Sequence, residues 1–165
     1  MSKSDAFLQA GKTAVLQNIH GTMQFLQRFP PFNHMENTHL AFLVEQCQLR
    51  FYGPGESIIR PADGPVEHFY IVKQGRVVGE RTHLGRGDTE TTFEITAGEC
   101  FPLAALLGER ATRTEHRAAE DTFCLQLGKA AFIKLFALSD EFRDFALRGV
   151  SSLLDKVNQQ VQQKA

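Results

Sequence analysis

The sequence predicts an α+β domain that is mainly β, with short strands folded into a sandwich or barrel and helices flanking them at both ends. Apolar residues alternate with polar ones over short segments in the middle of the chain, which is the period of a strand with one buried face. Turn residues separate these segments by about 8 to 15 residues, a spacing typical of antiparallel sandwiches and barrels. Apolar residues recur at helical spacing near both ends. The length of 165 residues suits one domain with a few additional helices.

Two helices are predicted before the strands. Apolar residues at helical spacing predict a first helix over residues 5–27. The segment RFPPFNHM ends it, because the residue before each proline is held away from helical conformations. Asn37 is the predicted N-cap of the second helix, whose apolar face carries Leu40 and Leu43.

Five strands are predicted next, from the segments QLRFY, SIIR, HFYIV, RVVGER and TTFEIT. The sequence GPGE between the first two is a turn, because glycine accepts a positive φ and proline fixes its own. KQG, from Lys73 to Gly75, separates two strands at the distance of a hairpin. The glycine-rich segment LGRGD, residues 84–88, is predicted to be an exposed loop.

A short helix near residues 102–107 is predicted to interrupt the strands, and two further strands and two helices follow it. The segments RAA and TFCLQL supply the strands. Lys129 begins the first of the two helices. Ser139 caps the second, with Asp140 and Glu141 in its first turn, where negative charge is favoured.

The composition narrows the class of protein. A net charge of -1, from 18 basic and 19 acidic residues, gives no general reason to expect a nucleic acid or an anionic membrane as partner. No apolar run is long enough to span a membrane and no signal-peptide pattern is present, so a cytoplasmic protein is predicted. Three widely spaced cysteines predict reduced thiols. Fourteen phenylalanines and no tryptophan predict a core built on phenylalanine.

The segment YGPGESIIRPADGPVEHFYIVKQGRV resembles the cyclic-nucleotide-binding domain family. In that family a Pro-Gly-Glu turn opens a strand, a Gly/Asp loop and an aromatic strand follow, and a Gly-x-Val hairpin closes the unit. This chain has Pro54-Gly55-Glu56, Asp63-Gly64, Phe69-Tyr70-Ile71-Val72 and Gly75-Arg76-Val77 in that order. The resemblance covers roughly residues 29–150 and implies a β-roll, a form of jelly roll, flanked by N-terminal and C-terminal helices.

The family's phosphate cassette is retained only in part. It reads Gly-Glu-x-Phe-Gly-Glu-Leu-Ala-Leu and then Pro-Arg-Ala-Ala-Thr, where the second glutamate holds the ribose and the arginine holds the cyclic phosphate. The entry Gly98-Glu99-Cys100-Phe101 matches, and Pro102 replaces the next glycine. Leu103 stands where the ribose glutamate belongs. A count without gaps places Thr112 where the arginine belongs, with Arg113 one residue later.

The resemblance implies a non-catalytic sensor whose ligand is a cyclic nucleotide or another small phosphate-bearing anion. Backbone N–H groups at the start of a helix attract such an anion, and the helix dipole adds to the attraction. A one-residue shift of register would turn Arg113 inward, because neighbours on an extended segment point to opposite sides. The predicted ligand-binding residues are Leu103, Ala104, Ala105, Thr112, Arg113 and Thr114.

The segment FPLAALLGERATRTEHRAAEDTFCLQL is similar to the corresponding segment of a narrower group of proteins. These are the N-terminal modules of bacterial signalling proteins in which a cyclic-nucleotide-type domain precedes a CBS pair and a nucleotidyltransferase-like domain. The resemblance implies that any catalysis lies in a domain outside this chain. The predicted division is an N-terminal helix over residues 1–28, the roll domain over 29–150, and the end of a C-terminal helix or linker over 151–165.

Two other functions stay open. The first is a ligand-free dimerisation or docking scaffold, with a homodimer through the apolar terminal helices. The second is a cupin-like metal enzyme, because cupins are also jelly rolls and His68 and His83 lie near Glu67 and Glu80. Metal ligation needs side chains that converge on one point, and no His-x-His pair is present to provide them.

Overall fold

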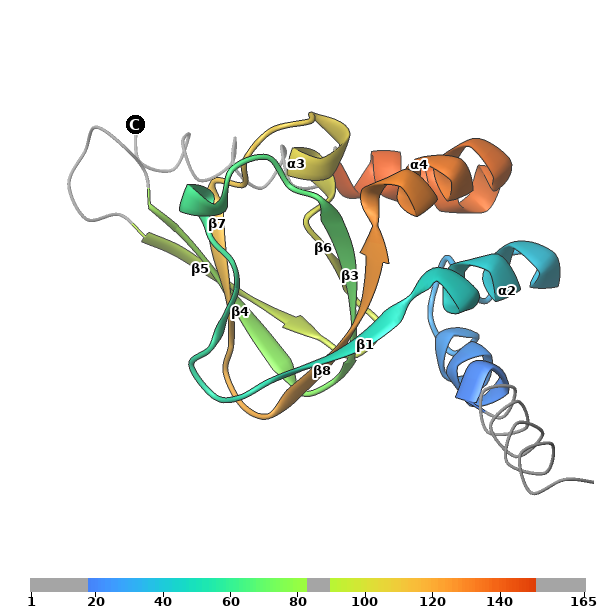
Figure 1. Ribbon diagram of the computed structural model, residues 1–165, viewed down its shortest axis with the longest axis horizontal. Helices are drawn as coiled ribbons and strands as arrows, with labels where there is room; N and C mark the ends of the chain where they lie inside the picture. Colours follow the sequence, from blue (N-terminus) through green and yellow to red (C-terminus); the bar gives the residue numbers. More distant parts are fainter. Residues whose placement is uncertain (1–17, 83–89, 151–165) are drawn as a thin grey trace, which may run out of the picture.

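Two antiparallel four-stranded sheets form a roll in the computed structural model, which describes residues 18–82 and 90–150 (Figure 1). The strands of the first sheet lie in the order β1-β8-β3-β6, and those of the second in the order β2-β7-β4-β5. The first sheet contains β1 (Gln48–Tyr52), β8 (Thr122–Gly128), β3 (His68–Gln74) and β6 (Cys100–Phe101). The second contains β2 (Ser57–Ile59), β7 (Thr114–Ala118), β4 (Arg76–Thr82) and β5 (Glu90–Thr96).

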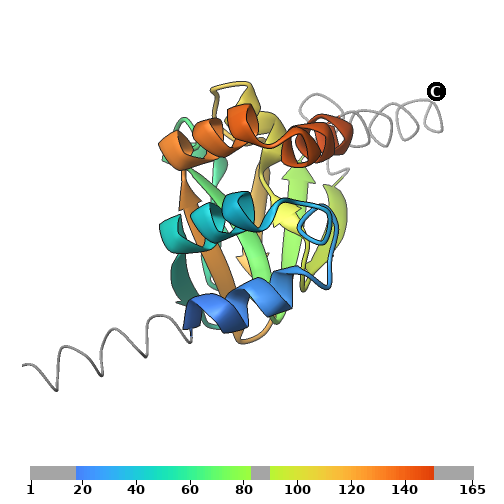
Figure 2. The ribbon, with the colours of Figure 1, turned by 90° about the vertical axis from the view of Figure 1, so that its right-hand side faces the viewer.

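Helices cover the outer face of the first sheet (Figure 2). They are residues 18–26, α2 (Asn37–Gln46), α4 (Lys129–Leu138) and residues 140–150. Two shorter helices lie within the strand region: the 3₁₀ helix η1 (Pro61–Asp63) and the cassette helix α3 (Leu103–Leu107). None of the described helices is long and apolar enough to cross a membrane.

Strand β3 supplies side chains to two separate cores, because successive residues of a strand point to opposite faces. Phe69 and Ile71 belong to the larger core, between the first sheet and the helices. Tyr70 and Val72 belong to the smaller core, inside the roll between the two sheets. The central strand therefore anchors the helices with one face and closes the roll interior with the other.

Phenylalanines dominate the helix-covered core, as the sequence predicts. The rings of Phe69, Phe132 and Phe142 lie with centroids 5.1 to 5.7 Å apart. All three side chains are buried, which contributes roughly 1.5–3 kcal/mol each to the free energy of unfolding. The ring of Phe142 joins residues 140–150 to the sheet, so this trailing helix is anchored at its first turn.

The structure confirms the predicted fold class and most of the predicted elements. Helix α4 begins at Lys129 as expected. The hydroxyl of Ser139 accepts a hydrogen bond from the N–H of Phe142 at 3.2 Å, which confirms it as the cap of the following helix. The three cysteines are free thiols, and burial raises the pKa of the Cys124 thiol to about 12, so it stays protonated.

The predicted N-cap of the second helix is wrong by one residue. Glu36 occupies the cap position, Asn37 is the first helical residue, and no side chain makes a cap hydrogen bond there. The expected helix over 5–27 is described only from residue 18, the loop over 84–88 lies outside the described residues, and so do residues 151–165.

Candidate functional site

The family's turn glutamates have structural roles in this chain. The carboxylate of Glu99 accepts hydrogen bonds from the N–H and the hydroxyl of Thr96, at 3.0 and 2.8 Å. Glu56 accepts from the N–H of Gly53 at 2.9 Å in the same way. In each case a carboxylate closes a turn by binding the N–H three residues before it. The retained Gly98-Glu99 entry therefore shapes the cassette and leaves no carboxylate for a ligand.

The cassette helix α3 follows Pro102, which lies just before the helix in an extended conformation. Ala105 and Leu106 are buried in the helix-covered core, which fixes the helix against the first sheet. The first N–H groups of any helix have no acceptor within the helix, so those of residues 103–105 can meet an external acceptor.

Leu103, which stands where the family has its ribose glutamate, packs against the trailing helix. Gly149 lies so close that a Cβ built on it would be 2.7 Å from Cδ1 of Leu103. Leu103 is half-buried and also packs against the helix-covered core. An apolar contact between the cassette and residues 140–150 thus takes the place of a ligand-binding carboxylate.

Thr112 lies in the roll wall where the gap-free count places the family's arginine. Its side chain is buried, and its hydroxyl donates to the backbone oxygen of Thr114 at 3.1 Å and accepts from the N–H of Thr114 at 3.1 Å. These two bonds close the bend that precedes β7. Arg113 is exposed, so no register shift buries it inside the roll. Its role as a ligand contact stays a prediction.

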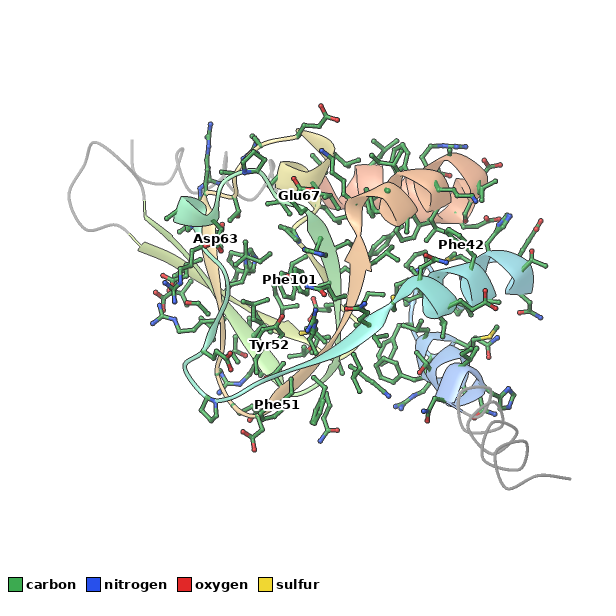
Figure 3. The ribbon with its side chains drawn as sticks, viewed as in Figure 1. Phe42, Phe51, Tyr52, Asp63, Glu67 and Phe101 are labelled. Carbon is green, nitrogen blue, oxygen red and sulfur yellow. The ribbon has the colours of Figure 1, made fainter. Side chains whose placement is uncertain are left out.

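Aromatic rings fill the roll interior below the cassette (Figure 3 shows Phe101 between the two sheets). Phe101 stacks on Tyr70 with centroids 5.2 Å apart and on His116 with centroids 4.6 Å apart. The ring of Phe93 lies edge-on to His116 at 6.2 Å and also covers Gly79. We call these residues, Tyr70, Phe93, Phe101 and His116, the aromatic floor.

The imidazole of His116, a member of the aromatic floor, has a displaced pKa. Its side chain is 3% exposed, and its Nδ1 has no hydrogen-bond partner among the described residues. Burial lowers the pKa of His116 to about 4, and a hydrogen bond with the backbone of Thr114 opposes part of this shift. The imidazole is therefore neutral at physiological pH. The sequence alone does not place this residue in the roll interior.

Strand β4 brings a further residue to the roll that sequence reasoning missed. Val77 and Gly79 are buried and face the interior, and the alternation places Arg81 on the same face. Arg81 pairs with Thr114 across the ladder between β4 and β7. The alternation was visible in RVVGER, but its inward face could be assigned only from the register with β7.

The model of the cyclic nucleotide-binding domain family matches residues 49–139, which is more than half of the chain. This chain belongs to the cyclic nucleotide-binding domain family. The matched segment runs from β1 to the end of α4, so it contains the whole roll and the cassette.

Solved structures with the same fold include three regulatory subunits of protein kinase A. The regulatory domain from Toxoplasma gondii with cAMP has a TM-score of 0.75 and 20% identity, covering 86% of this chain and 52% of that one. The subunit of a cAMP-independent kinase from Trypanosoma cruzi, bound to guanosine, has a TM-score of 0.74 and 20% identity, covering 91% of this chain and 52% of that one. A triple variant of the Trypanosoma brucei subunit, bound to cAMP, has a TM-score of 0.71 and 20% identity, covering 87% of this chain and 53% of that one. The chain thus spans about half the length of each.

Proposed function

We propose that this chain is a non-catalytic regulatory module that senses a small phosphate-bearing nucleotide at the cassette end of its roll. The observation that carries this proposal is the state of Thr112, which is buried and hydrogen-bonded to Thr114 where the family has its phosphate arginine. The cassette keeps the backbone shape of the family, but Leu103 and Thr112 stand where the family has its ribose glutamate and phosphate arginine. We infer that the ligand differs from cyclic AMP.

The anion would dock on the N–H groups of Leu103, Ala104 and Ala105, with Thr114 at the opposite wall and Arg113 at the rim. The contact between Leu103 and Gly149 would carry the signal, because it joins the cassette to the trailing helix. A ligand shifts that helix only if it binds one arrangement of cassette and helix better than the other.

Two relatives support a ligand other than cyclic AMP. The Trypanosoma cruzi subunit is described as cAMP-independent and holds guanosine. The Trypanosoma brucei structure with cAMP is a variant, and one of its three substitutions replaces a threonine by an arginine. This chain has a threonine, Thr112, where the gap-free count places the family's phosphate arginine.

A melting-temperature titration tests the proposal. Cyclic AMP, cyclic GMP, ATP and guanosine are added at millimolar concentration, and a ligand at 100 times its Kd adds about 2.7 kcal/mol to the free energy of unfolding. We expect a shift with a nucleotide other than cyclic AMP, and we expect Thr112→Arg to gain a shift with cyclic AMP. Thr38→Arg, an exposed change in α2, adds the same charge away from the roll as a control. No shift with any of the four compounds would contradict the proposal.

The wider context of the module is also a proposal. We propose that it is the N-terminal part of a longer cytoplasmic signalling protein of the CBS and nucleotidyltransferase type, with any catalysis in a domain outside this chain. The support for this proposal is the similarity of the segment FPLAALLGERATRTEHRAAEDTFCLQL to the N-terminal modules of those proteins.

A homodimer through the terminal helices is a second candidate. Ile133, Leu138 and Leu147 on α4 and the trailing helix are 49 to 52% exposed, so their side chains are available to a second copy of the chain. Light scattering of the purified chain measures the mass and decides between monomer and dimer. The cupin-like alternative gains no support, since no three His, Cys, Asp or Glu side chains of residues 18–82 and 90–150 are arranged to hold a metal ion.

A further inference from the structure

The inward face of β4 ends in a charge. Val77 and Gly79 point into the roll, where Val77 packs in the smaller core and Gly79 lies under the ring of Phe93. Arg81 continues this face by two residues, and it is half-buried. The outward residue between them, Glu80, binds Arg117 on the outside of the roll at 2.9 Å. The two faces of β4 therefore differ in charge, with a paired carboxylate on the outer face and an arginine in register with the inner face.

Arg81 lies beside the bend where the family has its phosphate arginine. It pairs with Thr114 of β7, and Thr114 is bonded to Thr112 through both of its backbone polar groups. Strand β4 thus has an arginine opposite the part of the wall where the chain before and in β7 has uncharged threonines. Ladder partners on the same face have Cβ atoms about 5 Å apart, well within the reach of an arginine side chain.

Two exposed arginines lie close to Arg81. Burial lowers the pKa of Arg81, and the positive charges of Arg113 and Arg110 lower it further. Among the described side chains, none of the carboxylates lies within ion-pair distance of these three guanidinium groups. The carboxylates nearest in sequence are occupied elsewhere: Glu80 and Glu115 contact Arg117, and Glu109 contacts Lys129. Three like charges gathered at one place favour an anion that offsets them.

We propose that Arg81, with Arg110 and Arg113, is the anion-binding element of this roll, and that it fits a nucleoside di- or triphosphate. This inference rests on the proposed sensing function and names the ligand class of the same site. The charge count carries the choice, because a cyclic monophosphate has one negative charge and a di- or triphosphate has two or more to set against three guanidinium groups. Arg81 reaches the ligand from inside the roll, and the other two contact its outer phosphates.

The test compares Arg81→Gln with Arg117→Gln. Both variants remove one positive charge from the β4–β7 ladder, but Arg117 lies on the outer face and is paired with Glu80. Calorimetric titrations use ATP, cyclic AMP and inorganic tripolyphosphate at two salt concentrations. We expect Arg81→Gln to weaken ATP binding by at least about tenfold, because a lost charge-assisted hydrogen bond costs that much affinity, and Arg117→Gln to change it little. We also expect ATP binding to weaken steeply with salt.

Melting temperatures measured with and without tripolyphosphate check that the arginines interact in the folded protein. Arg81→Gln should raise the melting temperature of the free chain, because it removes a partly desolvated charge from among like charges. Tripolyphosphate should raise the melting temperature of the wild type more than that of the variant. Equal loss of ATP affinity in both variants, or tighter binding of cyclic AMP than of ATP, overturns this inference while a sensing function stands. Binding of tripolyphosphate through Arg81 without binding of any nucleotide upholds the anion site and overturns the nucleotide function. No binding of any anion overturns both.

Discussion

The two ends of the roll interior use opposite chemistry. At one end the aromatic floor stacks Tyr70, Phe101 and His116 into a dry, apolar layer. At the other end Arg81 faces the interior beside the hydrogen-bonded bend of Thr112. Both ends are built by the same strands, β4 and β7, whose inward residues change from apolar to polar along their length. The position at which the inward residues of β4 and β7 change from apolar to polar therefore sets how deeply a ligand can enter the roll.

The difference shows how a family fold changes its ligand without changing its shape. The dry end supplies the packing that holds the two sheets together: Tyr70, Phe101 and His116 are buried and Phe93 is half-buried. The charged end contributes little packing, so substitutions there cost little stability and are free to alter binding.

The largest expected effect is a pH dependence that comes from His116. Its folded pKa is lowered to about 4 from an unfolded value of 6.5, so between these values the unfolded chain takes up a proton that the folded chain does not. Stability therefore falls as the pH falls through this window, by roughly 3 kcal/mol in total. Below pH 4 both states are protonated and the loss stops.

Urea unfolding at several pH values between 7 and 4 measures this effect. His116→Phe keeps an aromatic ring in the floor and removes the titration, so its unfolding free energy should decline much less over the same window. The difference between the two proteins isolates His116 from the carboxylates that both share. If the unfolding free energies of wild type and variant fell equally with pH, the imidazole would be solvated, and the claim that this end of the roll interior is dry would be wrong.

A smaller effect is expected from Gly79→Ala, which asks whether the dry end has room to spare. The added Cβ would meet the ring of Phe93, so the variant should lose roughly 1–3 kcal/mol of stability through overpacking. Gly53→Ala is the matched control, since its Cβ would meet nothing within 4 Å. In a Phe93→Leu background the cost at Gly79 should largely disappear. A neutral Gly79→Ala in the wild type would reveal space that a ligand could use.

The fold was predictable from the sequence because its signals are local. Period-two alternation, the Pro-Gly-Glu turn and the Gly98-Glu99 turn each act within a few residues, and the structure confirms the roll that they predict. The count that put Thr112 at the arginine's position also depended only on spacing. The structure shows that the side chain of Thr112 is buried there.

The candidate site was predictable only in part, because it depends on register between distant strands. The sequence shows Arg110, Arg113 and Arg117 as one group, but Arg117 lies on the outer face with Glu80 and Glu115. Arg81, 29 or more residues earlier in the chain, takes its place beside the other two through the pairing of β4 with β7. The sequence alone does not distinguish Arg81 from other surface arginines. Only the pairing of β4 with β7 places it opposite Thr114 and beside the bend.

The smallest expected effect concerns Gly149, where the trailing helix meets the cassette. Alanine in place of a helical glycine normally adds about 1 kcal/mol of stability. Here the new Cβ would lie 2.7 Å from Cδ1 of Leu103, so the gain should be offset in the wild type. In a Leu103→Ala background the contact is absent, and Gly149→Ala should stabilise by nearly its full amount.

A double-mutant cycle over Leu103 and Gly149 therefore measures the coupling between cassette and helix, with a magnitude of about 0.5–1 kcal/mol. Strict additivity would show that the helix does not rest on the cassette, and no signal could then pass through that contact. A coupling that vanishes when a nucleotide is bound would show more: the ligand would have moved the cassette away from the helix. The proposed anion site and this contact both involve Leu103, the site through its N–H and the contact through its side chain, so occupancy of the site would then be read at the contact.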